Sequence, residues 1–145
     1  MEAKQLMVNE VEQAQAEVIE EFGFFDNWMD RYQYIIDLGK RLPDLDASER
    51  VEENQIKGCQ SQVWFVAETK DDRLNFRAIS DAAIVSGLIA ILLRIYSGKK
   101  PSDILASSTE FVEALGLAQH LSPTRSNGLD SMLAAIQRFA AQANE

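Results

Sequence analysis

The feature that most limits the fold of this chain is an uncharged segment at residues 82–93, between Asp81 and Arg94. As a helix, this region is apolar on nearly every side, because it carries Ile84, Val85, Leu88, Ile89, Leu92, Leu93 and Ile95. A helix of that kind is buried in a protein core or in a membrane. This segment falls far short of the ~20 apolar residues that a membrane span needs. We therefore predict a central helix enclosed by other elements, with Ser80 or Asp81 as its N-cap and Gly98 at its end.

Two helices are predicted before the central one. Apolar residues recur at helical spacing over residues 4–21, and Gly23 ends this first helix. The second begins at Asp26, which can act as its N-cap, and ends at Pro43. One side of the second helix is apolar and carries Trp28, Tyr32, Ile35, Ile36 and Leu42.

Three shorter signals predict helices after the central one. Pro101 suits the first position of a short helix. Ser107 and Glu110 fit a capping box for another, which Gly116 ends. Ser122, followed by a proline, starts the last helix. Its apolar stripe consists of Leu129, Met132, Leu133, Ile136 and Phe139.

A small antiparallel sheet is predicted between the second helix and the central one. Aromatic and β-branched residues at 62–69 favour a strand that is covered on both faces. Residues 70–73 form a polar turn, and residues 74–78 alternate as in a half-buried strand. Residues 54–57 add a third strand. The order of elements predicts an α+β fold, with a small antiparallel sheet of about three strands packed with helices, in a single domain over residues 1–145.

Charge and cysteine content exclude several classes of protein. The formal net charge is −9, which repels phosphate backbones and argues against nucleic-acid binding. One cysteine allows no internal disulfide, and one cysteine with one histidine cannot complete a zinc site or an iron–sulfur cluster site. We expect no bound metal. The first residues show no secretory signal, and no membrane helix is expected, so we expect a cytoplasmic protein.

The chemistry of the chain concentrates around its one cysteine, Cys59. Gly58 precedes it and allows a sharp turn, while Gln60, Ser61 and Gln62 follow it and place it in a polar loop before the first strand. The neighbouring Lys57 could favour the thiolate, the nucleophilic form of cysteine. The alternative is a passive thiol that packs as a small apolar residue, and the residues by themselves leave both open.

Five segments of the sequence resemble the SufE family, including its relative CsdE. Residues 56–64, IKGCQSQVW, resemble the sulfur-acceptor loop of that family, and residues 31–43 resemble its second helix. Residues 80–88 resemble the start of its central helix. Residues 117–121 and 122–129 resemble its C-terminal signature. The segments also follow the family's order, so the resemblance covers nearly everything after about residue 27.

The resemblance implies a function. Members of this family bind a cysteine desulfurase, accept the outer sulfur of its persulfide on their cysteine, here Cys59, and pass it to an iron–sulfur scaffold. The implied partners are a SufS-like or CsdA-like desulfurase and a scaffold such as a SufB-containing complex. The implied fold is related to IscU scaffolds. No cofactor of its own is implied, because pyridoxal phosphate belongs to the desulfurase. Whether such an acceptor counts as an enzyme is a matter of definition, and a monomer and a homodimer both remain open.

Several residues are expected to support the cysteine. We expect Cys59 to be partly tucked against apolar residues in the free protein and to swing out on docking. Arg125 could hold a loop carbonyl or contact the partner, or it could be an ordinary surface arginine. Asp81 is expected first as a helix N-cap and second as a partner contact. Gln60, Ser61 and Gln62 could fix the loop, contact the desulfurase, or simply be solvated.

Two other functions compete with sulfur transfer. His120, the only histidine, could serve as a base for Cys59 in a cysteine-dependent hydrolase, although no local motif of such enzymes is present. A histidine at a helix end or on the surface is the simpler reading of His120. The third alternative is a structural module in which the thiol has no role.

Overall fold

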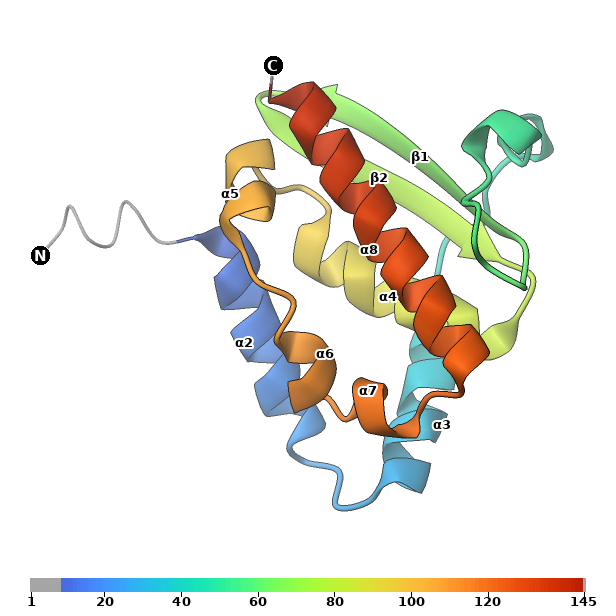
Figure 1. Ribbon diagram of the computed structural model, residues 1–145, viewed down its shortest axis with the longest axis vertical. Helices are drawn as coiled ribbons and strands as arrows, with labels where there is room; N and C mark the ends of the chain where they lie inside the picture. The colour runs from blue at the N-terminus through green and yellow to red at the C-terminus, as the bar shows by residue number, and fades with distance from the viewer. Residues whose placement is uncertain (1–8, 145) are drawn as a thin grey trace, which may run out of the picture.

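The computed structural model describes residues 9–144, which form two helices, a hairpin and then five more helices (Figure 1). The bounds are α2 Glu10–Phe22, α3 Trp28–Gly39, the 3-10 turns η1 Ala47–Glu49 and η2 Glu52–Asn54, β1 Val63–Lys70, β2 Arg73–Ser80, α4 Ala83–Tyr96, α5 Pro101–Ala106, α6 Phe111–Ala114, α7 Leu117–His120 and α8 Pro123–Ala143. The predicted start of the first helix lies outside the described residues. Within them, Asn9 caps α2 by accepting hydrogen bonds from the backbone of Val11 and Glu12.

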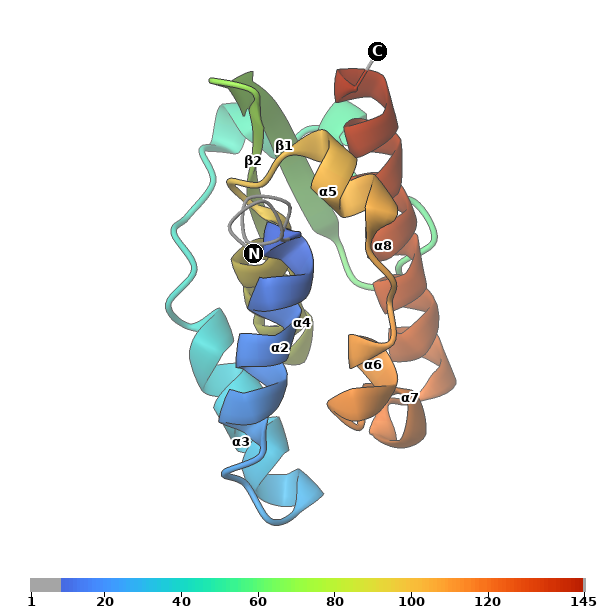
Figure 2. The ribbon, with the colours of Figure 1, turned by 90° about the vertical axis from the view of Figure 1, so that its left-hand side faces the viewer.

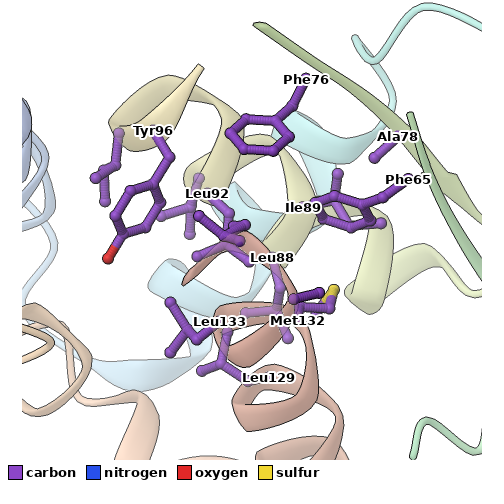
Figure 3. Close-up of a cluster of buried hydrophobic side chains, with 14 of the residues drawn as sticks. Phe65, Phe76, Ala78, Leu88, Ile89, Leu92, Tyr96, Leu129, Met132 and Leu133 are labelled. Carbon is purple, nitrogen blue, oxygen red and sulfur yellow. The ribbon is translucent and has the colours of Figure 1, made fainter. Parts of the chain in front are cut away.

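The central position of α4 is confirmed. It contacts α2, α3, β2 and α8, and Figure 2 shows α2 in front of it, α3 toward the lower left and α8 on the right. In Figure 3, Leu88 and Leu92 of α4 meet the hairpin residue Phe76 and the α8 residue Leu129 in one apolar cluster. These side chains are almost completely buried. Burial of this much apolar surface is the main force that holds the layers together.

Over the described residues, the sheet has two strands rather than the predicted three. β1 and β2 pair antiparallel from Val63–Ser80 to Lys70–Arg73, and the turn residues Asp71 and Asp72 both have positive φ, as a two-residue hairpin loop requires. The expected third strand is only an isolated bridge between Gln55 and Trp64. The preceding turns η1 and η2 leave too short an extended stretch for a ladder to form.

The first strand is buried on one face only, which corrects the prediction. Val63 and Phe65 are buried, whereas Trp64 and Val66 are half-buried. The outer face is partly covered by the turn segment, from which Glu49 pairs with Arg77 of β2 at 2.6 Å. The alternation expected for the second strand is confirmed, since Leu74, Phe76 and Ala78 are all buried.

Helices α3 and α4 approach each other through two glycines. A Cβ built on Gly87 would lie 2.1 Å from the carbonyl oxygen of Ile35, and one on Gly39 would lie 2.5 Å from the backbone nitrogen of Gly87. Only glycine fits such backbone contact. The first turns of α3 lie against the segment that leads into α8, since Arg31 donates to the carbonyl of Leu115 and Trp28 stacks on His120.

Some predicted helix boundaries are confirmed and others shift. Pro101 opens α5, and Ser122 caps α8. The second helix has Asn27 as its N-cap instead of Asp26, and it ends at Gly39 with Lys40 as its C-cap, before Pro43. Ser107 forms no capping box, because its hydroxyl donates to the carbonyl of Ile104 in the preceding helix.

Neither Ser80 nor Asp81 is the N-cap of α4; the N-cap residue is Ala82, whose own side chain makes no capping hydrogen bond. The Ser80 hydroxyl accepts from the backbone of Ala82, and the Asp81 carboxylate accepts from the backbone of Gln62. The Ser80 side chain therefore bonds to the N-cap residue instead of the first turn of α4, and the Asp81 side chain bonds to the loop before β1. Across residues 9–144, no helix combines the length and the apolar character needed to cross a membrane.

Candidate functional site

Cys59 lies at the tip of the loop between η2 and β1. The base of this loop is closed by a 2.9 Å hydrogen bond from the backbone of Ile56 to the carbonyl of Val63. Gly58 has φ of +90°, a left-handed conformation that glycine adopts without cost and other residues rarely do. That turn sends the loop onto α8, where a Cβ on Gly58 would come within 2.4 Å of the Ser131 hydroxyl oxygen. The prediction that Gly58 provides the turn is consistent with this geometry.

The sulfur of Cys59 rests against the second turn of α8. Its thiol is 3.6 Å from the carbonyl oxygen of Gly128, to which it donates a weak hydrogen bond. Gly128 leaves this space open, since a Cβ there would be in ordinary contact with the sulfur at 3.6 Å. Cys59 is half-buried, so the sulfur is partly shielded from water in this conformation.

A cavity of about 410 Å³ opens beside the sulfur. The cavity is lined by apolar side chains of α4 and α8 and by polar groups of the cysteine loop and the start of α8. The lining residues are Cys59, Gln60, Ser61, Val85, Leu88, Ser122, Thr124, Arg125, Gly128 and Met132. Leu88 and Met132 also belong to the apolar cluster of Figure 3, so the cavity reaches the edge of the core.

The electrostatic environment favours the neutral thiol in this conformation. Burial raises the pKa of the Cys59 thiol above its ordinary value, because a charged sulfur would lose hydration. Lys57 was expected to favour the thiolate, and the raised pKa of Cys59 gives that expectation no support. The Lys57 ammonium is exposed and pairs with Glu52 at 3.7 Å.

Among the described residues, Arg125 is the only charged one that lines the cavity. Its side chain is half-buried, and Nη1 donates to the hydroxyl of Tyr32 on α3 at 3.2 Å. The sequence predicted Arg125 near the cysteine, and both residues line the same cavity. The hydrogen bond that the structure records goes to Tyr32 instead of a loop carbonyl. Tyr32 was expected only as an apolar residue of its helix, and no sequence signal indicated its contact with Arg125.

The other predicted residues take different positions. Gln60 and Ser61 line the cavity, so they are available to a group that enters it. Gln62 contributes its backbone, whose N–H donates to the exposed Asp81 carboxylate at 3.1 Å. Asp81 therefore fixes the end of the cysteine loop, a role that its sequence position next to the central helix did not reveal.

His120 is engaged away from the cavity. Its ring stacks on Trp28 with centroids 4.5 Å apart, and Nδ1 lies 2.9 Å from the carbonyl oxygen of Gly116. It is exposed at the end of α7 and is not among the residues that line the cavity. The interpretation of His120 as a helix-end histidine agrees with these contacts, and they give no support to a Cys59–His120 pair.

The arrangement presents one thiol rather than a cluster of ligands. Within residues 9–144, no three His, Cys, Asp or Glu side chains gather where they could hold a metal ion. A lone thiol beside a cavity can act as a nucleophile that exchanges with another sulfur. The described lining of the cavity holds no base of the kind that nucleophilic hydrolysis requires.

Comparisons with known proteins agree on one family. Residues 16–140 match the SufE family, described as an Fe-S metabolism associated domain. An uncharacterized SufE-like protein of Rhizobium etli is 47% identical over 129 residues, covering 86% of this chain and 87% of that protein. A second, from Rhizobium meliloti, is 44% identical over 129 residues and covers 86% and 92%. The solution structure of a hypothetical protein from Thermus thermophilus superposes with a TM-score of 0.74 at 20% identity, over 90% of this chain and 95% of that one. This last likeness shows a shared fold.

Proposed function

Since this chain belongs to the SufE family, whose domain is associated with iron–sulfur metabolism, we propose that it is a sulfur acceptor for a cysteine desulfurase. Cys59 takes up a sulfane sulfur and later gives it to an iron–sulfur scaffold. The observation that carries the proposal is the position of Cys59. It sits at the tip of a loop, beside a cavity, with its sulfur half-buried.

The reaction is an exchange between sulfur atoms. The Cys59 thiolate attacks the outer sulfur of the desulfurase persulfide, a new S–S bond forms on Cys59, and the S–S bond on the desulfurase breaks. The desulfurase cysteine leaves as a thiolate, which takes up a proton, while Cys59 has given up its own. No electrons are gained or lost overall. A second exchange of the same kind moves the sulfur to the scaffold.

The position of Cys59 against α8 suits an acceptor that has not yet met its partner. The thiol is neutral and partly covered, so it reacts slowly with small oxidants and electrophiles. In-line attack on a partner's sulfur needs the loop to leave the carbonyl of Gly128. Docking of the partner supplies the differential contacts that favour the open loop. Gln60 and Ser61 line the same cavity and offer polar side chains to an approaching partner.

The proposed partners are a pyridoxal-phosphate-dependent desulfurase of the SufS type and a scaffold such as a SufB-containing complex. The cofactor stays with the desulfurase, and this chain contributes only the accepting cysteine. By removing the desulfurase persulfide, the chain also raises the rate at which the desulfurase turns over.

Intact mass spectrometry tests the proposal. The chain is mixed with a SufS-like desulfurase and cysteine, and we expect one added sulfur that disappears on reduction. Cys59→Ser should take up none. A variant that combines Cys59→Ser with Ser61→Cys is the matched control, because it keeps one thiol in the same loop at a different place. The proposal fails if the unaltered chain gains no sulfur, or if Cys59→Ser gains as much as the unaltered chain.

A further inference from the structure

We call Cys59 unloaded when it carries a thiol and loaded when it carries a persulfide. The surroundings of Cys59 fit the unloaded side chain better than the loaded one. The neutral thiol donates to the carbonyl oxygen of Gly128. A persulfide is a stronger acid than a thiol, so a loaded Cys59 is largely anionic at neutral pH. An anion cannot donate to a carbonyl oxygen, and the partial negative charge of that oxygen repels it. Loading therefore removes the contact that holds the side chain in place.

The cavity offers one positive group to the loaded sulfur. Arg125 is the only charged residue in its described lining, and it lies three positions before Gly128 on α8. Residues at that spacing are neighbours on the same face of a helix. Outside the lining, the loop residue Lys57 pairs with Glu52 at 3.7 Å, and Asp81 is an anion whose carboxylate accepts from the backbone of Gln62.

Tyr32 restrains the guanidinium of Arg125. The hydroxyl of Tyr32 accepts from Nη1 at 3.2 Å, and the arginine carbon Cζ lies 5.9 Å from the centre of the Tyr32 ring. The ring is itself held edge-on against Trp28, with centroids 6.3 Å apart. Arginine has many accessible rotamers, and fixing one of them in advance lowers the entropy lost when it binds an anion.

We propose that sulfur loading moves the Cys59 side chain from the Gly128 carbonyl to the guanidinium of Arg125. Tyr32 is then a positioning residue, because its hydroxyl keeps that guanidinium at the cavity. This inference rests on the proposed function, since it concerns the loaded form of the same cysteine. It assigns the unloaded and the loaded side chain to different partners within one cavity.

Tyr32→Phe tests the assignment, because it removes the hydroxyl and keeps the ring. The sulfur is loaded with free cysteine persulfide, which exchanges its outer sulfur onto the Cys59 thiol and leaves as cysteine. No desulfurase is needed, so this test stands or falls separately from the proposed function. The pH profile of iodoacetamide alkylation is then measured by mass for the loaded and the unloaded chain. Tyr34→Phe is the matched control, because it removes a hydroxyl from the same helix at a ring that packs against Phe22 and Phe25.

For the loaded sulfur, Arg125→Gln should move the alkylation midpoint upward by about one pH unit, as loss of a nearby opposite charge does. Tyr32→Phe should move it the same way by about half as much. Tyr34→Phe should leave it in place. In the unloaded chain all three variants should keep the midpoint of the unaltered protein, which a general loosening of the fold would not do. The proposal is overturned if the loaded profile of Tyr32→Phe or Arg125→Gln coincides with that of the unaltered chain, or if the loaded and unloaded profiles shift equally.

Discussion

The thiol of Cys59 and the carbonyl oxygen of Gly128 are 3.6 Å apart, although the two residues are separated by 69 positions in the sequence. This contact joins the cysteine loop to the longest helix of the fold. Burial at this position raises the pKa of the Cys59 thiol and favours its neutral form, and a cavity lies beside the sulfur. The half-buried sulfur is therefore held in its protonated form, which is the less reactive form of a cysteine.

The pH dependence of Cys59 alkylation should reveal the raised pKa of the thiol. Because burial raises the pKa of the thiol, the midpoint of iodoacetamide reactivity should lie at higher pH in the folded chain than in the chain unfolded in urea. The folded state then keeps a proton that the unfolded state has already lost. The contribution of this proton to the free energy of unfolding is fully present below the pKa of Cys59 in the unfolded chain. It is lost as pH rises through the pKa of Cys59 in the folded chain. Equal midpoints in folded and unfolded chains would contradict the half-buried position.

Gly58→Ala should release the cysteine loop. Alanine is strained at φ of +90°, and its Cβ would lie 2.4 Å from the Ser131 hydroxyl oxygen. We expect a loss of about 1 kcal/mol in the free energy of unfolding and faster alkylation of Cys59. Combining the change with Ser131→Gly separates the two causes. The double variant relieves the collision but not the strain, so its alkylation rate should fall between those of the single variant and the unaltered chain.

Gly128→Ala should stabilise the fold while slowing access to the sulfur. The residue is inside a helix, where alanine is favoured over glycine by about 0.5–1 kcal/mol, and its Cβ would meet the sulfur at an ordinary contact distance of 3.6 Å. Urea denaturation should show the gain, and alkylation of Cys59 should become slower because the methyl group covers one side of the sulfur. A drop in stability would mean that the loop cannot dock against any side chain at this position.

Gly87→Ala should damage the packing of α3 on α4. The added Cβ would come 2.1 Å from the carbonyl oxygen of Ile35, which is backbone and cannot move without shifting the helix. We expect a loss of about 1–3 kcal/mol, measured by urea denaturation. Ala83→Ser, at an exposed position of the same helix, should stay within about 0.5 kcal/mol of the unaltered chain. Unchanged stability in Gly87→Ala would show that the two helices separate easily.

His120→Ala distinguishes sulfur transfer from hydrolysis. The change removes the stack on Trp28 and should lower the free energy of unfolding by about 1 kcal/mol. Sulfur uptake by Cys59 should continue at the unaltered rate, because His120 does not line the cavity. A cysteine-dependent hydrolase would instead lose its base, so a strong fall in Cys59 chemistry would favour that alternative.

Local signals were sufficient for much of the architecture. The uncharged run after Asp81 predicted the buried central helix, since no amphipathic surface helix has that composition. The alternation at 74–78 predicted the buried face of β2, and Ser122 predicted the start of α8. The cysteine loop was recognised because polar residues follow Cys59 directly before an apolar strand. Each of these signals depends on neighbours within a few positions.

The structure departs from the sequence-based expectations where a side chain takes another partner and where an extended segment is too short to pair. Asp81 was expected to cap its own helix, yet its carboxylate accepts from Gln62, 19 positions away. Lys57 was expected to favour the thiolate, yet it pairs with Glu52. The third strand failed because one bridge at Gln55 is too short to form a ladder.

The amino-acid sequence alone determined most of the helical and extended segments, the position of the single cysteine and the resemblance to a family, because these depend on periodicity and short motifs. Only the tertiary structure decided what surrounds the sulfur. Cys59 meets Gly128, and Arg125 meets Tyr32 across 93 positions. Such pairs form when α3, α8 and the cysteine loop pack around α4, and that packing depends on the whole set of buried contacts instead of any one segment.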